Sequence, residues 1–209
     1  MSDVMTFGFD NEEIKGGLYE KYKAKKNETN RGAIVYTDPK AMFVGHPTHF
    51  KDRYFFCKKG QCCQVLGPAK YRIGAVLIKY GTDRNGTPKK PFSWELFPWA
   101  FSEVTYLKLK SMNSEFPLAT HDIKISCTNE EYQHLDIVPC NECLWISRDE
   151  FKLQVQEAAK PIWDSLKKTL ASDLTVEQIS ELLGMGGTAS ASGVDPSSKL
   201  DLNSVLDSI

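Results

Sequence analysis

The sequence lacks several features that would assign it to a common class of protein. Its apolar runs fall short of the roughly 20 residues that cross a bilayer, so we expect no membrane span. The first residues lack the basic and apolar regions of a signal peptide. We therefore expect a cytoplasmic protein whose six cysteines stay reduced. The net charge is only −1, so the charge of the whole chain predicts no class of partner.

Common catalytic motifs are missing as well. The chain has no GxxxxGK(S/T) phosphate loop, no GxGxxG dinucleotide loop, no GxSxG nucleophile turn and no HExxH zinc motif. Its four histidines are scattered without a spacing that indicates catalysis. We therefore expect a protein that is not an enzyme and that acts by binding.

The sequence does contain a block, residues 50–110, that is both basic and aromatic. It holds twelve Lys and Arg against four Asp and Glu, a net of +8, so the rest of the chain sums to −9. Twelve of the 23 Phe, Tyr and Trp residues also lie in this block. Cations attract a phosphate backbone and exposed rings stack on unpaired bases, which indicates sequence-tolerant binding of single-stranded nucleic acid. The alternative is that the rings form a β-rich core and the lysines its solvated face.

This basic-aromatic block supplies the candidate DNA-binding residues. Its cations would follow the phosphates, and some of its rings would stack on bases. The candidate cations are Lys51, Arg53, Lys58, Lys59, Lys70, Arg72, Lys79, Lys89, Lys90, Lys108 and Lys110. The candidate rings are Tyr54, Tyr71, Tyr80, Trp94, Trp99 and Tyr106. Lys89 and Lys90 follow an Asn-Gly turn, where a hairpin loop could close over a bound strand.

Hydrophobic periodicity predicts a mainly β core. Strand-like runs cover residues 33–36, 53–57, 71–80, 105–110, 123–127 and 132–138. With an Asn-Gly turn after the third run and little helix between the runs, this pattern predicts a small closed or Greek-key barrel. We place this core at residues 33–146, after a polar and basic N-terminal arm at residues 1–32.

Helical periodicity follows the core. Ser147 and Glu150 have the spacing of a helix cap, and Pro161 should kink or divide the helix that comes after them. A second short helix is predicted to start at Thr175, with Gln178 three residues on. We interpret residues 147–184 as packing helices rather than as a partner surface.

The last residues have the composition of a linker and a tail. Residues 185–209 begin with a run rich in Gly, Ala and Ser, which is typical of a flexible linker, and end in alternating acidic and aliphatic residues. From residue 172 onward there are six acids and one base, a net of −5. We interpret this tail as a docking peptide, and the alternative is a terminus without a role.

The cysteines offer two metal-ligand spacings. One is the CxxC pair at residues 140–143, and the other groups His49 and Cys57 with Cys62 or Cys63. A single CxxC is a weak signal, and adjacent cysteines are awkward ligands for one tetrahedral ion. A composite site from both groups is conceivable, but buried reduced cysteines without metal are the favoured interpretation.

The order of these features resembles the single-stranded DNA-binding proteins of tailed bacteriophages, including the helix-destabilising protein of the T-even phages. The layout of arm, basic aromatic core, linker and acidic-aliphatic tail covers most of the chain, and the likeness is closest at residues 49–62 and 200–206. It implies an OB-fold-like barrel with C-terminal helices, whose groove holds single-stranded DNA. The implied function is sequence-independent binding and protection of this DNA in phage replication, recombination and repair.

The resemblance also implies partners, a location and a metal. The arm would support cooperative self-association on DNA, and the tail would recruit replication or recombination proteins and compete with DNA for the groove. The location would be the cytoplasm of the infected bacterial host. A structural zinc ion would be held by one His and three Cys, for which His49, Cys57, Cys62 and Cys63 are the candidates.

Two other functions remain open from the sequence. A regulator that binds duplex DNA or RNA would also have a basic face, but it would discriminate by sequence or by the 2′-hydroxyl. A non-enzymatic adaptor or transcription-associated protein would instead use the aromatic residues 92–107 as a protein contact.

Overall fold

The computed structural model describes residues 20–128 and 135–185, so residues 1–19 of the expected arm and the tail from residue 186 lie outside the described residues. The described part is dominated by one antiparallel sheet of seven strands, with helices on both faces. The strands are β1 (Thr29–Val35), β2 (Val44–Lys51), β3 (Arg53–Phe56), β4 (Lys70–Tyr80), β5 (Trp94–Ser102), β6 (Ile123–Cys127) and β7 (Leu135–Pro139). The helices are α1 (Gln61–Leu66), α2 (Glu103–Asn113), α3 (Asp149–Leu170) and α4 (Val176–Leu182), with a 3-10 turn η1 (Pro39–Ala41).

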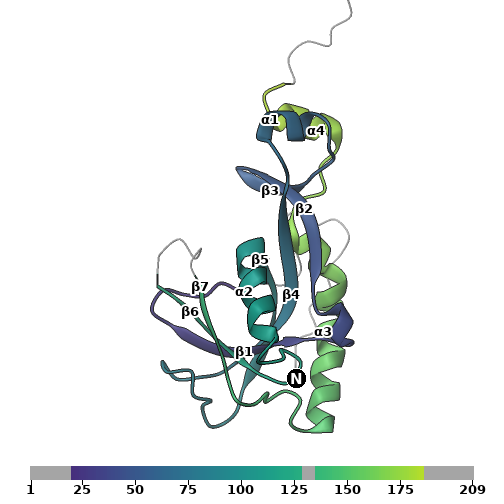
Figure 1. The fold of residues 1–209 in the computed structure, drawn as a ribbon. Helices are drawn as coiled ribbons and strands as arrows, with labels where there is room; N and C mark the ends of the chain where they lie inside the picture. Colours follow the sequence, from purple (N-terminus) through teal and green to yellow (C-terminus); the bar gives the residue numbers. More distant parts are fainter. Residues whose placement is uncertain (1–19, 129–134, 186–209) are drawn as a thin grey trace, which may run out of the picture.

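The long strand β4 organises the sheet. Its first residues pair with β2 and its last with β1 along one edge, while β5 pairs along the other edge. The order β3-β2-β4-β1-β6-β7 follows from these pairings. The β2–β3 hairpin, the start of β4, α1 and α4 project from the rest of the molecule (Figure 1). We call residues 44–73 and 172–185 the projecting lobe and the other described residues the body.

The predicted closed barrel is wrong. β3 and β7 end the strand order, and no ladder joins them among the described residues. One reason is that β1 and β2 share one edge of β4, so the sheet branches into two arms instead of curving onto itself. The described strands therefore form an open sheet, and an OB fold is not confirmed.

The predicted strand at residues 105–110 is also wrong, because this segment belongs to α2. The sequence alternates apolar and polar residues there, but the side chains that become buried are Thr105 and Leu109. These residues are one helical turn apart, whereas Leu107 is exposed. The buried positions therefore follow the helical period even though the sequence also fits a strand.

Helix α3 covers the face of the sheet opposite α2. Val155, Ile162 and Leu166 line its buried stripe. Pro161 lies inside the helix, so of the two predicted effects, a kink or a division, the division does not occur. Ser147 is not its cap, since Arg148 holds that position and the Ser147 hydroxyl donates to the carbonyl of Leu144.

The capping box predicted for the last helix is confirmed. The Thr175 hydroxyl accepts from the backbone amide of Gln178, and the Gln178 side chain accepts from the amide of Thr175. This reciprocal pair fixes the start of α4 within the projecting lobe.

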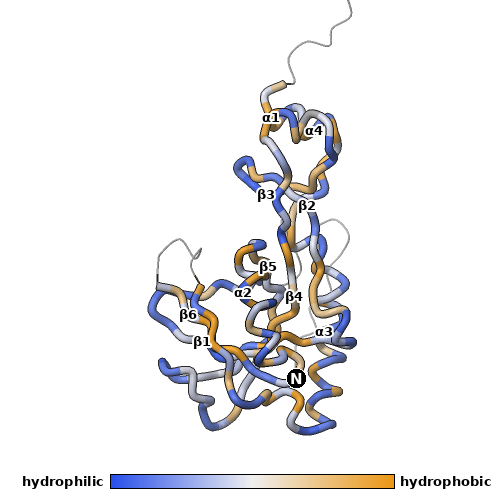
Figure 2. Tube along the Cα trace, in the orientation of Figure 1, coloured by the Kyte–Doolittle hydropathy of each residue, from blue (hydrophilic) through white to orange (hydrophobic). Residues whose placement is uncertain are grey.

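The body has a hydrophobic core on each face of the sheet. Ala75, Leu77 and Trp99 face α2, whereas Val76, Ile78 and Trp145 face α3. The hydropathy of the chain follows this arrangement, with hydrophobic residues gathered on the central strands (Figure 2). No helix in the described ranges is long and apolar enough to cross a membrane.

Two close packings tie other segments to the body. A Cβ on Gly74 would lie 2.7 Å from the end of the Leu170 side chain, so a larger residue there would displace the contact between β4 and α3. Tyr22 is buried against Trp99, and its amide donates to the carbonyl of Pro98. The part of the expected arm that the structure describes, residues 20–32, is therefore folded against the sheet.

Candidate nucleic-acid interface and metal cluster

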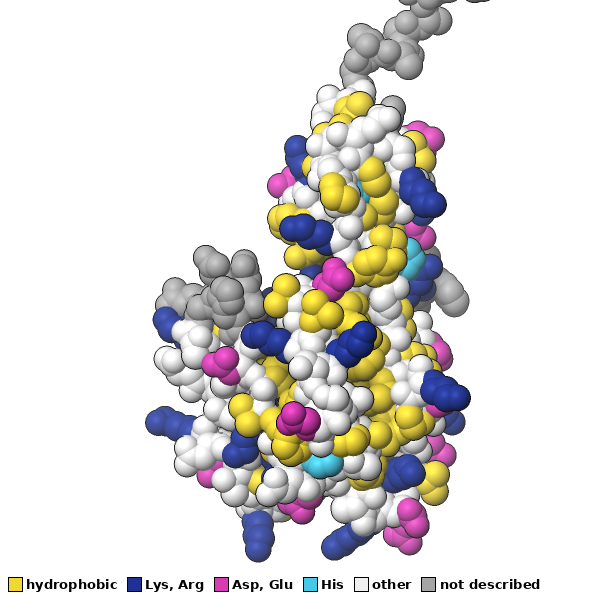
Figure 3. All heavy atoms as spheres, in the orientation of Figure 1, with side chains coloured by type: hydrophobic (Ala, Val, Ile, Leu, Met, Phe, Trp, Pro, Cys, Tyr) yellow, Lys and Arg dark blue, Asp and Glu magenta, His cyan; other side chains and the backbone are white. Residues whose placement is uncertain are grey.

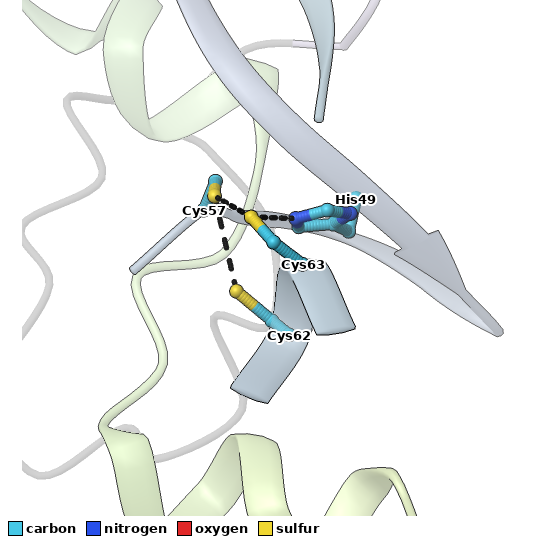
Figure 4. A group of neighbouring side chains, drawn as sticks. All are labelled: His49, Cys57, Cys62 and Cys63. Carbon is cyan, nitrogen blue, oxygen red and sulfur yellow. Dashed lines mark hydrogen bonds between the residues drawn. The ribbon is translucent and has the colours of Figure 1, made fainter. Parts of the chain in front are cut away.

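The projecting lobe brings four potential metal ligands together. His49 lies on β2, Cys57 follows β3, and Cys62 and Cys63 lie on α1. Lys59 and Gly60 take positive φ angles of 62° and 58°, which turn the chain back after β3 and start α1 beside Cys57. The three thiols and the imidazole point toward one another (Figure 4).

Three of the ligand distances in this cluster are close to those of a tetrahedral site. The Cys57 Sγ is 3.3 Å from the Cys63 Sγ and 3.8 Å from the Cys62 Sγ, and the Cys63 Sγ is 3.6 Å from the His49 Nε2. All four ligand atoms lie within 4.8 Å of one another. Tetrahedral zinc, with bonds of about 2.3 Å to sulfur and about 2.0 Å to nitrogen, separates its ligand atoms by about 3.5–3.8 Å. The cluster could therefore hold a metal ion, and its residues and spacing fit zinc.

The pKa values of the cluster favour metal binding at His49 and Cys57 and oppose it at Cys63. Burial lowers the pKa of His49, which favours the neutral imidazole that binds metals. Burial raises the pKa of Cys57, but hydrogen bonds from the Lys59 amide and the Cys63 and Cys62 thiols outweigh it, so the net shift is downward. The hydrogen bond to Cys57 raises the pKa of Cys63 to about 11. The neighbouring thiols therefore shift the pKa of one another, and a bound metal ion would displace their protons.

Although adjacent cysteines are awkward ligands for one ion, Cys62 and Cys63 are both placed to bind. Cys62 and Cys63 both reach Cys57 because the first turn of α1 directs both thiols to the same side of the loop. The CxxC pair at residues 140–143 lies elsewhere, beside Asp122 in the body, where the Cys140 amide donates to the Asp122 carbonyl. Within the described residues the two groups do not form a composite site.

The lobe has little hydrophobic core of its own. Around the cluster, the buried apolar residues are Phe55, Cys62, Leu174 and Ile179. Units with so small a core depend on disulfides or metals for their stability. A metal at the four ligands would therefore join the β2–β3 hairpin to α1.

The structure removes two of the predicted stacking rings from the interface. Tyr80 and Trp99 are 0% and 2% exposed, so they are core residues and cannot stack on bases. Trp94 is half-buried and packs against Phe151 of α3. The sequence could not separate these rings from binding rings, because the same residue types, Tyr and Trp, serve both in cores and in binding surfaces.

Two predicted rings are exposed on the projecting lobe, and a third was missed. Tyr54 and Tyr71 are 40% and 53% exposed, and Phe50 is 61% exposed. Phe50 lies opposite Tyr54 across the β2–β3 hairpin, with ring centroids 4.9 Å apart. The guanidinium of Arg72 lies 3.8 Å from the centroid of the Tyr54 ring. Phe50 and Tyr54 flank a tight turn at Asp52, so a hairpin there would place their rings opposite each other. The prediction did not use this pattern.

A hollow of about 290 Å³ lies beside Tyr71 on the α2 side of the sheet. Phe43 and Tyr106 form one wall in an edge-to-face pair with centroids 5.5 Å apart, and Tyr71 and Glu103 also line it. On this side of the molecule, hydrophobic side chains gather between the lobe and the body, with Lys and Arg around them (Figure 3). Tyr71 and Tyr106 therefore flank a hollow of mixed polarity that is large enough for a planar ring.

The predicted cations divide between the lobe and the body. Residues 44–73 hold six Lys and Arg against one acid, Asp52, and five of the six cations are exposed. The lobe cations are Lys51, Arg53, Lys58, Lys59, Lys70 and the half-buried Arg72, of which Lys58 pairs with Asp173.

The other predicted cations do not join this surface. Lys79 lies over Phe97, and the Lys108 ammonium donates to the carbonyl of Leu135. Lys89, Lys90 and the preceding turn follow the far end of β4, which spans about 30 Å at the usual rise of a strand. The exposed Lys110 is on α2. The structure thus does not place the Asn-Gly hairpin where it could close over a strand on the lobe.

No family model matches the chain, and comparisons with curated proteins and solved structures found no match. We therefore base the functional proposal on the geometry of the lobe, namely its four potential metal ligands and its exposed rings and cations.

Proposed function

We propose that this protein binds single-stranded DNA without sequence preference, through the projecting lobe. The observation that carries the proposal is the position of the exposed rings. Of the twelve rings in residues 50–110, four are exposed, namely Phe50, Tyr54, Tyr71 and Phe92. Three of these lie on the lobe, where residues 44–73 hold six Lys and Arg against one acid and residues 172–185 add three acids. Exposed rings beside exposed cations are what unpaired bases on a phosphate backbone require.

The mechanism combines stacking with charge neutralisation. Each base stacked on a ring contributes about 1–3 kcal/mol, and any base can stack because each has a π face. Each phosphate that Lys or Arg neutralises releases counterions, so affinity falls by about 0.7 log units per log unit of salt concentration. Duplex DNA should bind more weakly because its base faces are already stacked on one another.

We further propose that zinc occupies the cluster of His49, Cys57, Cys62 and Cys63 as a structural ion. His49 adjoins Phe50, and Cys57 directly follows the strand that carries Tyr54. Fixing the ligands would therefore also fix the rings proposed to contact DNA. Coordination by these four residues would join the hairpin to α1.

The resemblance to the phage proteins supports the same function in replication, recombination and repair of phage DNA in the host cytoplasm. Most of the arm proposed for cooperative binding (residues 1–32) and of the tail proposed for recruiting replication proteins (residues 185–209) lies outside the described residues, namely residues 1–19 and 186–209.

The adaptor alternative loses its main support. Its contact surface was the aromatic run at residues 92–107, but Trp99 and Phe101 are buried there, and Trp94 and Phe97 are half-buried in the same cores. Few rings of this run are free to contact a partner.

A binding titration tests the proposal. Fluorescence anisotropy of labelled oligo-dT suits this protein better than tryptophan quenching, because Trp99 and Trp145 are buried. We expect binding that weakens with salt, and a large loss in a variant with alanine at Phe50, Tyr54 and Tyr71. Phe92→Ala, at the exposed ring on the body, is the matched control and should bind normally. Absence of binding by the unaltered protein at low salt would refute the function.

A further inference from the structure

The hollow beside Tyr71 combines aromatic rings with one charged side chain. Its volume is about 290 Å³, and its lining residues are Phe43, Gly45, Tyr71, Ile73, Glu103 and Tyr106. The rings of Phe43 and Tyr106 meet edge to face with centroids 5.5 Å apart, and Tyr71 is more than half exposed. A planar ligand in this space would therefore contact several aromatic rings.

Gly45 leaves the hollow open. It lies on β2 opposite Ile73 of β4, and its backbone has no positive φ that would require glycine. A Cβ there would lie 3.6 Å from Ile73 Cγ1 and 3.9 Å from Tyr71 Cδ1, which are ordinary contacts. Alanine would therefore fit, whereas a longer side chain would extend into the space that these residues line.

Glu103 is the charged residue of the hollow. It is exposed in the first turn of α2. None of the ion pairs between described residues includes Glu103. An ionised carboxylate accepts hydrogen bonds and donates none. The hollow therefore suits a planar ligand whose edge carries N–H donors.

We propose that the hollow holds one base of the bound strand and that Glu103 favours a base with an exocyclic amino group. This inference rests on the proposed function and deepens it, because it adds a preference at one position of a strand that otherwise binds without regard to sequence. The base would lie beside Tyr71, and its amino group would donate a hydrogen bond to the Glu103 carboxylate.

The four bases differ at the edge that would face Glu103. Cytosine, adenine and guanine each carry an amino group, and acidic side chains accept hydrogen bonds from such a group. Thymine has carbonyl oxygens instead, and its N3–H donor lies between them. A carboxylate repels these oxygens, so the hollow should hold thymine most weakly.

A titration with two pyrimidine strands tests the preference, because cytosine and thymine have rings of the same size. Labelled oligo-dC and oligo-dT of equal length are compared at neutral pH and at one salt concentration. We expect the unaltered protein to bind oligo-dC about 5-fold more tightly, which is the lower end for one recognised base edge. Equal affinities, or tighter binding of oligo-dT, would overturn the proposal.

Glu103→Gln tests the role of the carboxylate. A glutamine amide both donates and accepts, so it can also bind the carbonyl oxygens of thymine, and the preference for oligo-dC should disappear. Glu115→Gln is the matched control, because it removes the same charge from an exposed residue beyond the other end of α2 and should keep the preference. The readout is the ratio of the two affinities, since removing an acid strengthens binding of either strand alike. A preference that persists in Glu103→Gln would contradict the assignment.

Gly45→Leu tests the location of the base. The leucine side chain would fill part of the hollow, so it should weaken binding of oligo-dC and abolish the preference. Gly45→Ala is the control, because it adds only a Cβ in ordinary contact with Ile73 and Tyr71. An unchanged preference in Gly45→Leu would place the recognised base elsewhere and refute the site.

A measurement on the unaltered protein does not depend on the folding of variants. The methyl resonances of Ile73 are followed while deoxycytidine monophosphate, thymidine monophosphate or lysine amide is added. A base in the hollow shifts these resonances by its ring current, and we expect deoxycytidine monophosphate to act at the lowest concentration. A shift with lysine amide alone would show a cation site and overturn the proposal, as would no shift with any of the three.

The two proposals can fail separately. If neither strand binds to the unaltered protein, the proposed function fails. If both strands bind equally and Glu103→Gln changes their affinities no differently from Glu115→Gln, only the base site fails.

Discussion

Arginine and tyrosine side chains have different surroundings in the body and in the projecting lobe. In the body, Arg31 meets Asp122 and Glu142, and the buried Tyr80 donates a hydrogen bond to Asp122. In the lobe, Arg72 has no acidic partner in the described residues, and Tyr71 is exposed. Cations and rings thus stabilise the fold in the body, whereas in the lobe they are left available for a ligand.

The largest expected effect concerns the metal, which in our account does for the lobe what the two cores do for the body. We expect about one zinc per chain, and its loss in Cys63→Ser should increase hydrogen exchange in the lobe while leaving the central strands protected. Structural zinc contributes about 10–16 kcal/mol of apparent binding free energy in small metal-dependent units.

The control for this experiment is Cys140→Ser, because Cys140 lies beside Asp122 and outside the four-ligand cluster. Metal analysis and hydrogen exchange should match those of the unaltered protein. Purified protein without metal, or equal metal loss in both variants, would contradict the assignment.

The second prediction compares the two arginines. Asp122→Ala leaves the Arg31 charge poorly compensated in the body, and it should lower the free energy of unfolding by about 3–5 kcal/mol. Arg72→Gln removes a charge that has no acidic partner, so it should cost about 1 kcal/mol or less, mainly through the lost contact with Tyr54. Urea denaturation measures both, and equal losses would show that the charge of Arg72 is compensated in the fold.

The third prediction separates binding rings from core rings. Tyr71→Ala should weaken oligo-dT binding by about 1–3 kcal/mol, or roughly 5–150-fold, with little change in stability. Trp99→Ala should instead lower the free energy of unfolding by about 3–5 kcal/mol, because it opens a cavity in the core. A Tyr71→Ala protein with a lower free energy of unfolding but normal oligo-dT binding would contradict the assignment of Tyr71 as a binding ring.

The smallest effect is a pH dependence of the lobe. Burial lowers the pKa of His49 from its ordinary value of 6.5, so the unfolded state binds the proton more readily than the folded state. The stabilisation is therefore complete above about pH 6.5 and decreases as the pH falls through that value toward the folded pKa. The free energy of unfolding of the metal-free protein, measured from pH 8 to 5, should decrease in that interval, whereas a constant value would contradict the lowered pKa of His49.

The sequence predicted elements whose signals are local. The strand at residues 71–80 and the capping box of Thr175 and Gln178 depend on periodicity and short-range hydrogen bonds, and both were found. Residues 105–110 fit two periods, and only the packing of Thr105 and Leu109 against the sheet decides for a helix. Whether the sheet closes depends on which strands pair with each edge of β4, and local sequence patterns do not predict this pairing.

The candidate site was predicted by composition but not by position. Tyr71 and Tyr80 lie on the same strand, yet Tyr71 is on the projecting lobe and Tyr80 is buried in the core beneath α3. The metal cluster depends on the backbone turn at Lys59 and Gly60, which brings α1 back to the hairpin. Burial and long-range contacts of this kind are properties of the whole fold, so the sequence identified the residue types but could not sort them.

Titration of the full-length protein with labelled oligo-dT and with a duplex of equal length, at low and high salt, tests the central claim most directly. We predict that the single strand binds more tightly than the duplex at low salt, and that alanine at Phe50, Tyr54 and Tyr71 removes most of this preference. Equal or tighter binding of the duplex, or no binding of either, would contradict the assignment of the lobe as a surface for single-stranded DNA.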